Sequence, residues 1–148
     1  MRIEHALEIQ APLERLWALT AQVVDWPRIT PTVTDVEPLD DGPLRVGSRF
    51  RLKQPGQPLR VWTVTALEPQ RRFAWSTRLL GLVMTGVHEL VATDTGTRNV
   101  LRVELTGWGA TLVGLLLRMP ISRAIARENE GFRVAAESSP HPIDARDR

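Results

Sequence analysis

The sequence predicts an α+β domain: a curved seven-stranded antiparallel sheet, with two short helices after its first strand, gripping a long C-terminal helix. Two observations predict this fold. Residues 33–107 alternate apolar and polar side chains in short runs separated by turn residues, which is typical of strands joined by hairpins. From residue 109 onward the apolar spacing becomes that of a helix. Because a sheet with one apolar face must cover it, and only this helix is long enough, we expect the helix to lie across the sheet.

Composition is ordinary for one globular domain: 148 residues, 43% hydrophobic and 24% charged. The absence of cysteine excludes disulfides, thiolate catalysis and cysteine-ligated zinc. No apolar run reaches the roughly 18–20 residues that span a membrane, and the first residues lack a signal-peptide pattern. We therefore expect a cytoplasmic protein.

The first strand is predicted at residues 3–10, where isoleucine and leucine alternate with glutamate. Pro12 suits the first turn of a following helix, which carries Trp17 on its apolar stripe. A second short helix is expected at residues 21–26, and Pro27 is expected to end it.

Six further strands are expected, each bounded by turn residues. The clearest turns are Pro-Gly-Gln-Pro at residues 55–58 and Asp-Thr-Gly at residues 94–96, where Gly96 is expected to adopt a positive φ. The strands are predicted at residues 33–39, 47–54, 59–68, 71–80, 83–93 and 97–107.

The long helix is predicted at residues 109–137. Its apolar stripe passes through Leu112, Leu116 and Met119 and continues toward the end of the helix with a slow drift. Residues 138–148 are polar and are expected to be a disordered tail, so residues 1–137 would form the domain.

Positive charge comes almost entirely from arginine, although the net charge is only +2. Arg49, Arg51 and Lys53 alternate along one face of a predicted strand, as a nucleic-acid-binding stripe would. The same pattern is typical of a solvated outer sheet face. We favour the second interpretation and expect no nucleic acid.

Several short segments of the sequence resemble those of a known family in their order and spacing. Residues 9–17 (IQAPLERLW), 25–28 (DWPR), 64–75 (VTALEPQRRFAW) and 128–132 (ENEGF) resemble the START/polyketide cyclase-dehydrase-like (SRPBCC, helix-grip) superfamily. The resemblance covers roughly residues 3–137. It implies a cavity between the concave sheet and the long helix. Since the superfamily includes lipid carriers, hormone receptors and aromatase/cyclases, the resemblance is specific for the fold and not for the function.

Many large side chains are candidates to line that implied cavity. Aromatic residues with a polar edge suit an apolar ligand that carries one polar group, although a filled core gives the same pattern. The expected ligand-binding residues are Trp26, Phe50, Leu52, Trp62, Phe73, Trp75, Thr77, Met84, His88, Leu90, Leu116, Met119, Arg123 and Phe132.

His88 is the best catalytic candidate, because it shares a strand face with Met84 and Leu90. An imidazole there could bind a ligand carbonyl or act as acid or base, and a satisfied buried histidine is the alternative. Arg123 or Arg78 are possible oxyanion partners. The histidines lack the spacing of a zinc site, so we expect no metal and no cofactor.

Three functions remain open: a carrier of a small hydrophobic molecule (lipid- or polyketide-like), an aromatase/cyclase-like enzyme, and a module for membrane-proximal lipid delivery or protein contact. An acid–base pair inside the cavity would favour the enzyme, and a wholly apolar lining would favour the carrier. Exposure of residues 112–117 would favour transient membrane contact or a protein partner.

Overall fold

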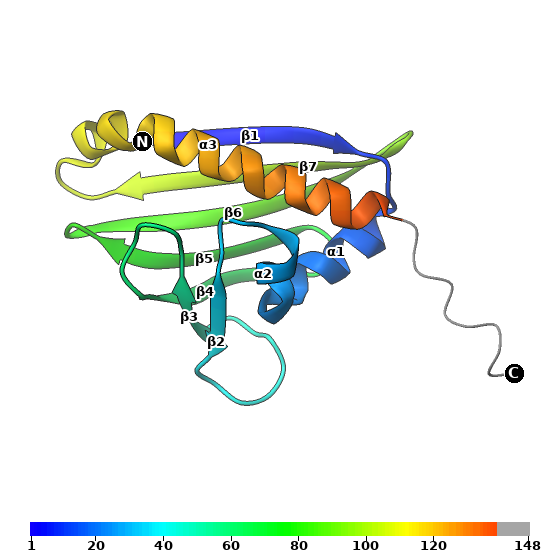
Figure 1. Cartoon of the computed structure of the whole chain (residues 1–148), viewed down its shortest axis with the longest axis horizontal. Coiled ribbons are helices and arrows are strands. Elements are labelled where there is room, and N and C mark those ends of the chain that lie inside the picture. Colours follow the sequence, from blue (N-terminus) through cyan, green and yellow to red (C-terminus); the bar gives the residue numbers. More distant parts are fainter. Residues whose placement is uncertain (139–148) are drawn as a thin grey trace, which may run out of the picture.

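The computed structural model describes residues 1–138 and confirms the predicted fold (Figure 1). Within these residues, seven antiparallel strands form one sheet in the order β1-β7-β6-β5-β4-β3-β2, and the long helix crosses one face of it. The strands are β1 (Arg2–Ile9), β2 (Asp35–Pro38), β3 (Arg49–Lys53), β4 (Arg60–Glu68), β5 (Arg72–Leu79), β6 (Leu82–Thr93) and β7 (Gly96–Thr106). The helices are α1 (Leu13–Ala21), the 3-10 helix η1 (Val23–Asp25), α2 (Trp26–Ile29) and α3 (Ala110–Glu137). Apart from Ser138, the expected tail lies outside the described residues.

The second short helix differs from its prediction. Pro27 does not end it: a 3-10 turn comes first, and α2 then begins at Trp26 with Pro27 in its first turn. Proline is tolerated there because the first turn of a helix needs no N–H donor. The result places the Trp26 side chain inside the protein, where it is buried.

Alternation along the strands places one set of side chains under α3 and the other on the outer face of the sheet. The inward set is buried, as expected: Phe50, Leu52, Trp62, Phe73, Trp75, Thr77, Met84, His88 and Leu90. Trp26 of α2 and Phe132 of α3 close this core, with ring centroids 5.5 Å apart in an edge-to-face contact.

The first half of α3 packs through a different stripe from the predicted one. Ala110 and Gly114 face the sheet and are buried, whereas Leu112, Leu116 and Met119 are exposed. The helix approaches so closely that a Cβ at Gly114 would overlap the side chain of Met1. Small residues are therefore needed on this side, and a stripe drawn through the largest apolar residues selects the wrong one.

A buried amide cluster fixes α3 on the sheet. Asn129 donates to the Asn99 carbonyl oxygen at 3.1 Å and to the His5 carbonyl oxygen at 3.3 Å, and it accepts from Asn99 Nδ2 at 2.9 Å. Both asparagines are fully buried. Because a buried polar group without partners is costly, these bonds favour one position of the helix over others.

The end of α3 is capped by a side chain from α1. The Arg15 guanidinium donates to the carbonyl oxygens of Ala136, Ala135 and Ser138 at 2.6, 3.1 and 2.7 Å. These carbonyls have no partner within the helix, and a cation at this end also interacts favourably with the helix dipole.

Gly96 has a different role from the expected one. It does not adopt a positive φ. Instead, it pairs with Thr93 at the end of the β6–β7 hairpin, where a Cβ would overlap the Ile9 carbonyl oxygen and lie 3.1 Å from the Ala11 nitrogen. Glycine is required there by close approach of two backbones.

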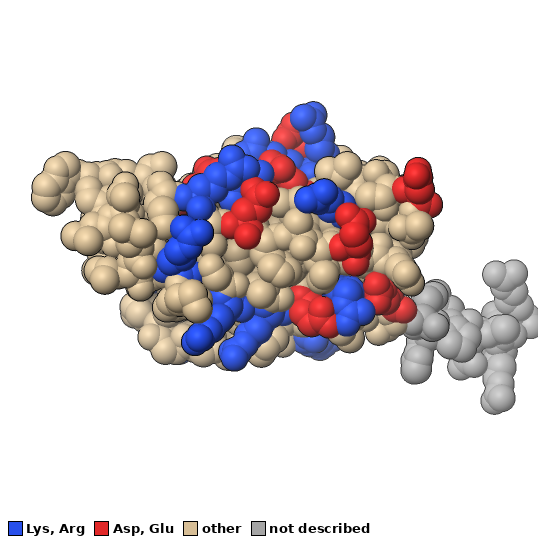
Figure 2. All heavy atoms as spheres, turned by 90° about the horizontal axis from the view of Figure 1, so that it is seen from above, with Lys and Arg blue, Asp and Glu red and all other residues tan. Residues whose placement is uncertain are grey.

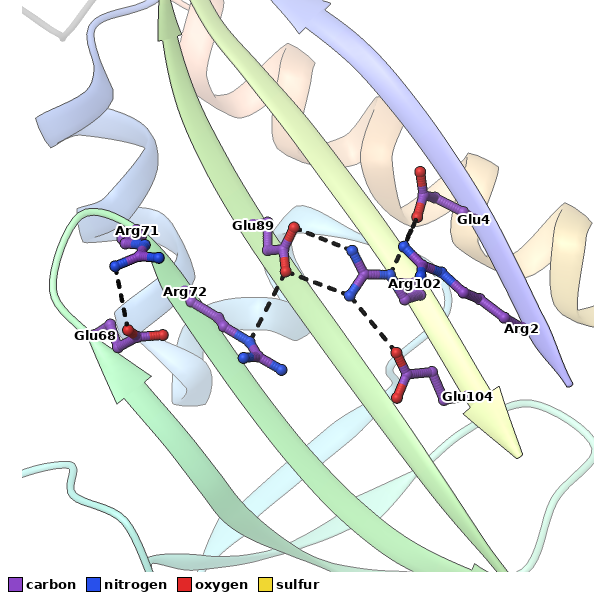
Figure 3. Close-up of polar contacts among 8 residues, drawn as sticks. All are labelled: Arg2, Glu4, Glu68, Arg71, Arg72, Glu89, Arg102 and Glu104. Atoms are coloured by element: carbon purple, nitrogen blue, oxygen red, sulfur yellow. Dashed lines mark hydrogen bonds and ion pairs between the residues drawn. The ribbon is translucent and has the colours of Figure 1, made fainter. Parts of the chain in front are cut away.

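Several arginines on the outer sheet face are paired with carboxylates, as Arg72 and Arg102 are in Figure 3. Arg102, whose side chain is 11% exposed, contacts Glu4 at 3.1 Å, Glu89 at 3.0 Å and Glu104 at 3.6 Å. On β3, Arg49 pairs with Asp40 and Arg51 with Glu37. This confirms that the basic residues of β3 lie on an outer sheet face.

Replacing Arg102 by leucine should lower the free energy of unfolding by roughly 1–3 kcal/mol near neutral pH, because three carboxylates lose a shared partner. Arg2 and Arg102 hold the pKa of Glu4 below its ordinary 4.5. A lowered folded-state pKa stabilises the fold above the unfolded value, and this stabilisation disappears as the pH falls through the folded value.

Urea unfolding at neutral and acid pH measures this effect. The wild type should lose more stability on acidification below about pH 4.5 than Arg102→Leu does. The control is Arg78→Leu, at an exposed arginine of β5 that forms no ion pair with a described residue. Identical pH dependence in all three proteins would contradict the prediction.

Among residues 1–138, no helix is both long and apolar enough to span a membrane.

Candidate ligand-binding and acid–base site

A cavity of about 110 Å³ lies between the sheet, α3 and the segment that follows α2. Its lining is mostly apolar, and three tryptophans, Trp26, Trp62 and Trp75, contribute to it. Its polar lining residues include His88 of β6 and Glu128 of α3, together with Thr32, Gln54, Gln57 and Arg102. The cavity is therefore an aromatic chamber with a small polar region.

The aromatic wall is built around Trp26. Its ring centroid lies 5.0 Å from that of Trp75, 5.0 Å from the His88 imidazole and 5.8 Å from Phe73, and its indole N–H donates to the Leu19 carbonyl oxygen at 3.3 Å. Edge-to-face aromatic contacts of this kind favour fixed ring orientations. The wall is thus held in place before any ligand binds.

His88 and Glu128 form a buried pair. His88 Nε2 lies 3.1 Å from Glu128 Oε1, and the two side chains are 4% and 15% exposed. The other carboxyl oxygen, Oε2, accepts from the Thr32 hydroxyl at 3.2 Å, and Thr32 Oγ1 lies 2.8 Å from Thr30 Oγ1. An imidazole oriented by a carboxylate, which is itself oriented by a hydroxyl, is the arrangement of a general base.

Two buried polar atoms of the cavity lining lack a hydrogen-bond partner among the described residues: Trp62 Nε1 and His88 Nδ1. The indole nitrogen can only donate. When the carboxylate of Glu128 is ionised it can only accept, so the proton between the two groups is on His88 Nε2, and Nδ1 is an acceptor when the imidazole is neutral. Trp62 Nε1 is therefore a donor, and His88 Nδ1 of a neutral imidazole an acceptor, that have no partner among the described residues and almost no exposed surface.

Gly86 of β6 leaves room for the indole rings of Trp62 and Trp75, which pack close to its backbone. A Cβ at this position would lie 3.1 Å from Trp75 Nε1 and 3.7 Å from Trp62 Cζ3. A side chain there would push both rings, so glycine in the middle of this strand marks a close approach.

A second, more open depression of about 360 Å³ adjoins the chamber. The two share Thr32, Gln54, Gln57 and Ala124 as lining residues. Arg123 and Arg127 of α3 line the outer depression. A ligand too large for the chamber would extend into this depression, which we call the mouth.

The structure brings together only part of the expected site. Six predicted residues line the chamber: Trp26, Leu52, Trp62, Trp75, Met84 and His88. Phe50, Phe73, Thr77, Leu90 and Phe132 are buried but lie behind this lining. Arg123 lines the mouth rather than the chamber, and Arg78, the other suggested oxyanion partner, is exposed and lines neither. The expectation that Leu116 and Met119 face the cavity is wrong, because both are exposed and line neither the chamber nor the mouth.

Sequence reasoning missed Glu128 and Thr32 as members of the site. Glu128 follows Ile121 and Ile125 on the inward stripe of the helix, and a carboxylate on an apolar stripe was the available signal. Thr32 lies in an irregular segment, where no periodicity shows which side chains point inward. Among residues 1–138, no three histidine, aspartate or glutamate side chains lie close enough together to hold a metal ion.

Comparisons with solved structures agree with this geometry at the level of the fold. The chain is similar to the di-domain aromatase/cyclase StfQ of the steffimycin pathway, with a TM-score of 0.73 and 17% identity over 92% of this chain and 50% of that one. It is also similar to the Zhui aromatase/cyclase of Streptomyces sp. R1128, with a TM-score of 0.64 and 21% identity over 95% and 99% of the two chains. A protein of Helicobacter pylori, jhp0584, aligns with a TM-score of 0.77 at 12% identity, over 92% and 88% of the chains.

Sequence comparison identifies the family. Over 63 residues, or 42% of its length, the chain is 38% identical to the actinorhodin polyketide synthase bifunctional cyclase/dehydratase of Streptomyces coelicolor, of which this match spans only 19%. The family model described as polyketide cyclase / dehydrase and lipid transport matches residues 1–137. That match covers all the elements that form the chamber, and the chain belongs to the polyketide cyclase/dehydrase and lipid transport family.

Proposed function

We propose that this protein binds a small, flat hydrophobic molecule that carries a hydroxyl or enol group. One observation carries the proposal: an aromatic chamber whose lining residues Trp62 and His88 each hold a buried polar atom, Nε1 and Nδ1, without a partner among the described residues. A hydroxyl group both accepts and donates, so one such group satisfies both atoms. Leaving either atom unpaired costs about 1–3 kcal/mol, and a ligand that pairs them recovers this free energy.

The size of the chamber restricts the ligand. Its volume of about 110 Å³ is below the roughly 150 Å³ of an engineered cavity that binds benzene, and below the 300–1,000 Å³ of drug-sized pockets. We infer that only the hydroxyl-bearing edge of the molecule enters the chamber, while the rest of the molecule lies in the mouth. Cyclised polyketides are fused aromatic phenols, and the family's description is consistent with such a ligand.

Calorimetric titration with 2-naphthol and with naphthalene tests this proposal. The two probes share an apolar body and differ only in the hydroxyl. We expect 2-naphthol to bind about tenfold more tightly, which corresponds to the net free energy of one to two buried hydrogen bonds. Trp62→Phe should remove much of this preference because it deletes the indole N–H, and it should also lower the free energy of unfolding by about 1–2 kcal/mol because ring atoms packed against Trp75 are lost.

The matched control is Trp108→Phe, which makes the same chemical change at a side chain that is 99% exposed. Its preference for 2-naphthol should equal that of the wild type. Equal affinity of the wild type for both probes, or no binding of either, would overturn the proposal. Native mass spectrometry of the purified protein would then identify any molecule that it carries in the cell.

A second candidate function, cyclase/dehydratase-like catalysis, is favoured by the His88–Glu128 pair. In the dehydration of a β-hydroxy ketone, His88 Nδ1 would take the proton from the carbon beside the carbonyl. Glu128 would stabilise the resulting imidazolium, and the same proton would return to the departing hydroxyl, which leaves as water. The products are an unsaturated ketone and one water, and this reaction needs neither metal nor cofactor.

Location in the cytoplasm and absence of nucleic acid among the partners stay predictions.

A further inference from the structure

The first turns of α3 expose a set of large apolar side chains. Trp108, just before the helix, is 99% exposed. Leu112, Leu115, Leu116 and Met119 are each at least 60% exposed. We call these five residues the α3 apolar patch. Isolated exposed leucines are normal, but a contiguous group of this size on a small domain marks an interaction surface.

The patch lies at one end of the molecule and carries no charge of its own. β7 ends at Thr106, which pairs with Val83 near the β5–β6 hairpin, so that hairpin and Trp108 lie at the same end of the sheet. The hairpin adds Leu80, which is 78% exposed and has a positive φ. On the face drawn in Figure 2, the end of the molecule where α3 begins carries no charged side chain, and the charged side chains lie over the remainder of that face.

The border of the patch is positive. From Leu105 to Arg127 the sequence contains three arginines, Arg118, Arg123 and Arg127, and neither aspartate nor glutamate. All three are exposed, and none forms an ion pair with a residue between 1 and 138. They differ in this from Arg49, Arg51, Arg102 and Arg133, which contact carboxylates.

We propose that the α3 apolar patch binds the surface of a bilayer that contains anionic phospholipid. Tryptophan and leucine side chains enter the boundary between headgroups and acyl chains, and neighbouring arginines are attracted by anionic headgroups. A second copy of the chain fits the patch less well. A symmetric contact through residues 105–127 would leave the arginines of both copies without a carboxylate partner, because this segment contains neither aspartate nor glutamate.

This orientation would place the mouth of the chamber near the bilayer. Leu116 lies one turn before Pro120 on the same side of α3, and Met119 lies one turn before Arg123. Both Pro120 and Arg123 line the mouth. A lipophilic molecule could then pass between bilayer and chamber with little exposure to water. The same contact accounts for large apolar residues on the outer side of α3, which the fold itself does not use.

Vesicle flotation tests the proposal. The full chain is mixed with vesicles of phosphatidylcholine alone or with about one third phosphatidylglycerol, at low and high salt. We expect binding to the anionic vesicles, with at least about a tenfold loss at high salt, and a blue shift of the exposed Trp108 emission. Leu112→Ser/Leu116→Ser should abolish flotation, and Arg118→Ala/Arg123→Ala should weaken it at least about tenfold.

The control variant, Val46→Ser/Val91→Ser, changes two exposed valines outside the patch and should float as the wild type does. Equal flotation with both vesicle types, or equal loss in the control and the patch variants, would overturn the proposal. So would a dimer in solution that Leu112→Ser/Leu116→Ser dissociates, in a protein that does not float. Trp62→Phe should float normally, so failure of the chamber proposal is distinguishable from failure of this one.

Discussion

Gly131→Val should lower the free energy of unfolding by about 4 kcal/mol, which for a chain of this size corresponds to a fall of about 10–15 °C in Tm. A Cβ at this position would overlap the carbonyl oxygen of Ile29 and lie 3.2 Å from its carbonyl carbon. The neighbouring atoms are backbone and cannot rotate away. The variant must therefore separate α3 from α2, and a separation reaches the core through Trp26 and Phe132, whose rings touch.

Arg118→Val provides the control for this variant. It places the same β-branched residue at an exposed position of the same helix, so it reports only the intrinsic cost of valine in a helix, which is about 0.5 kcal/mol. Urea unfolding and near-ultraviolet circular dichroism of the tryptophan cluster measure both variants. If Gly131→Val lowers the free energy of unfolding no more than Arg118→Val does, α2 can move away from α3 without cost. The contact between the two helices then does not hold the site together.

The strands were predictable because their signal is local. A period of two fixes which face each side chain takes, so the inward positions from Phe50 on β3 to Leu90 on β6 followed from the sequence. The lengths of the strands also agree to within a few residues. The order of the sheet required the family resemblance, since alternation alone does not say which strands are neighbours.

The helix was harder to place because its inward face is defined by contacts rather than by hydrophobicity. At the start of α3, closeness to the sheet selects Ala110 and Gly114, and the leucines are left on the outside. A larger hydrophobic residue is normally the better guide to burial. The rule that larger apolar residues are buried fails where two backbones approach so closely that only small residues fit. It also fails where exposed apolar residues serve to contact another molecule.

The acid–base pair could not be predicted from the sequence, because its two residues are 40 positions apart on different elements and a loop residue, Thr32, positions one of them. His88 was a candidate from its strand face alone. Its partner depends on the rotation of α3, which the Asn99–Asn129 contact fixes, and on the position of Thr32 after α2. Each of these is a tertiary contact without a local pattern.

Glu128→Gln should reduce the rate of dehydration of a β-hydroxy ketone substrate by about 10²–10⁴-fold, if the pair acts in catalysis as proposed. Glutamine has the same shape: its amide oxygen can still accept from His88 Nε2, and its amide nitrogen, in place of Oε2, can donate to the Thr32 hydroxyl oxygen. What disappears is the negative charge that stabilises the imidazolium. A loss in kcat with little change in KM is therefore expected, since the ground state binds in the same chamber.

Two further variants separate a catalytic pair from a structural one. His88→Asn removes the base itself and should reduce the rate at least as much as Glu128→Gln, with no additional loss when both are combined, because the two residues act as a unit. Thr32→Val, which only positions the carboxylate, should have a smaller effect and shift the pH–rate profile. If the wild type turns over no such substrate, or if Glu128→Gln leaves kcat unchanged, the pair is a ligand anchor, and the chamber serves binding without chemistry.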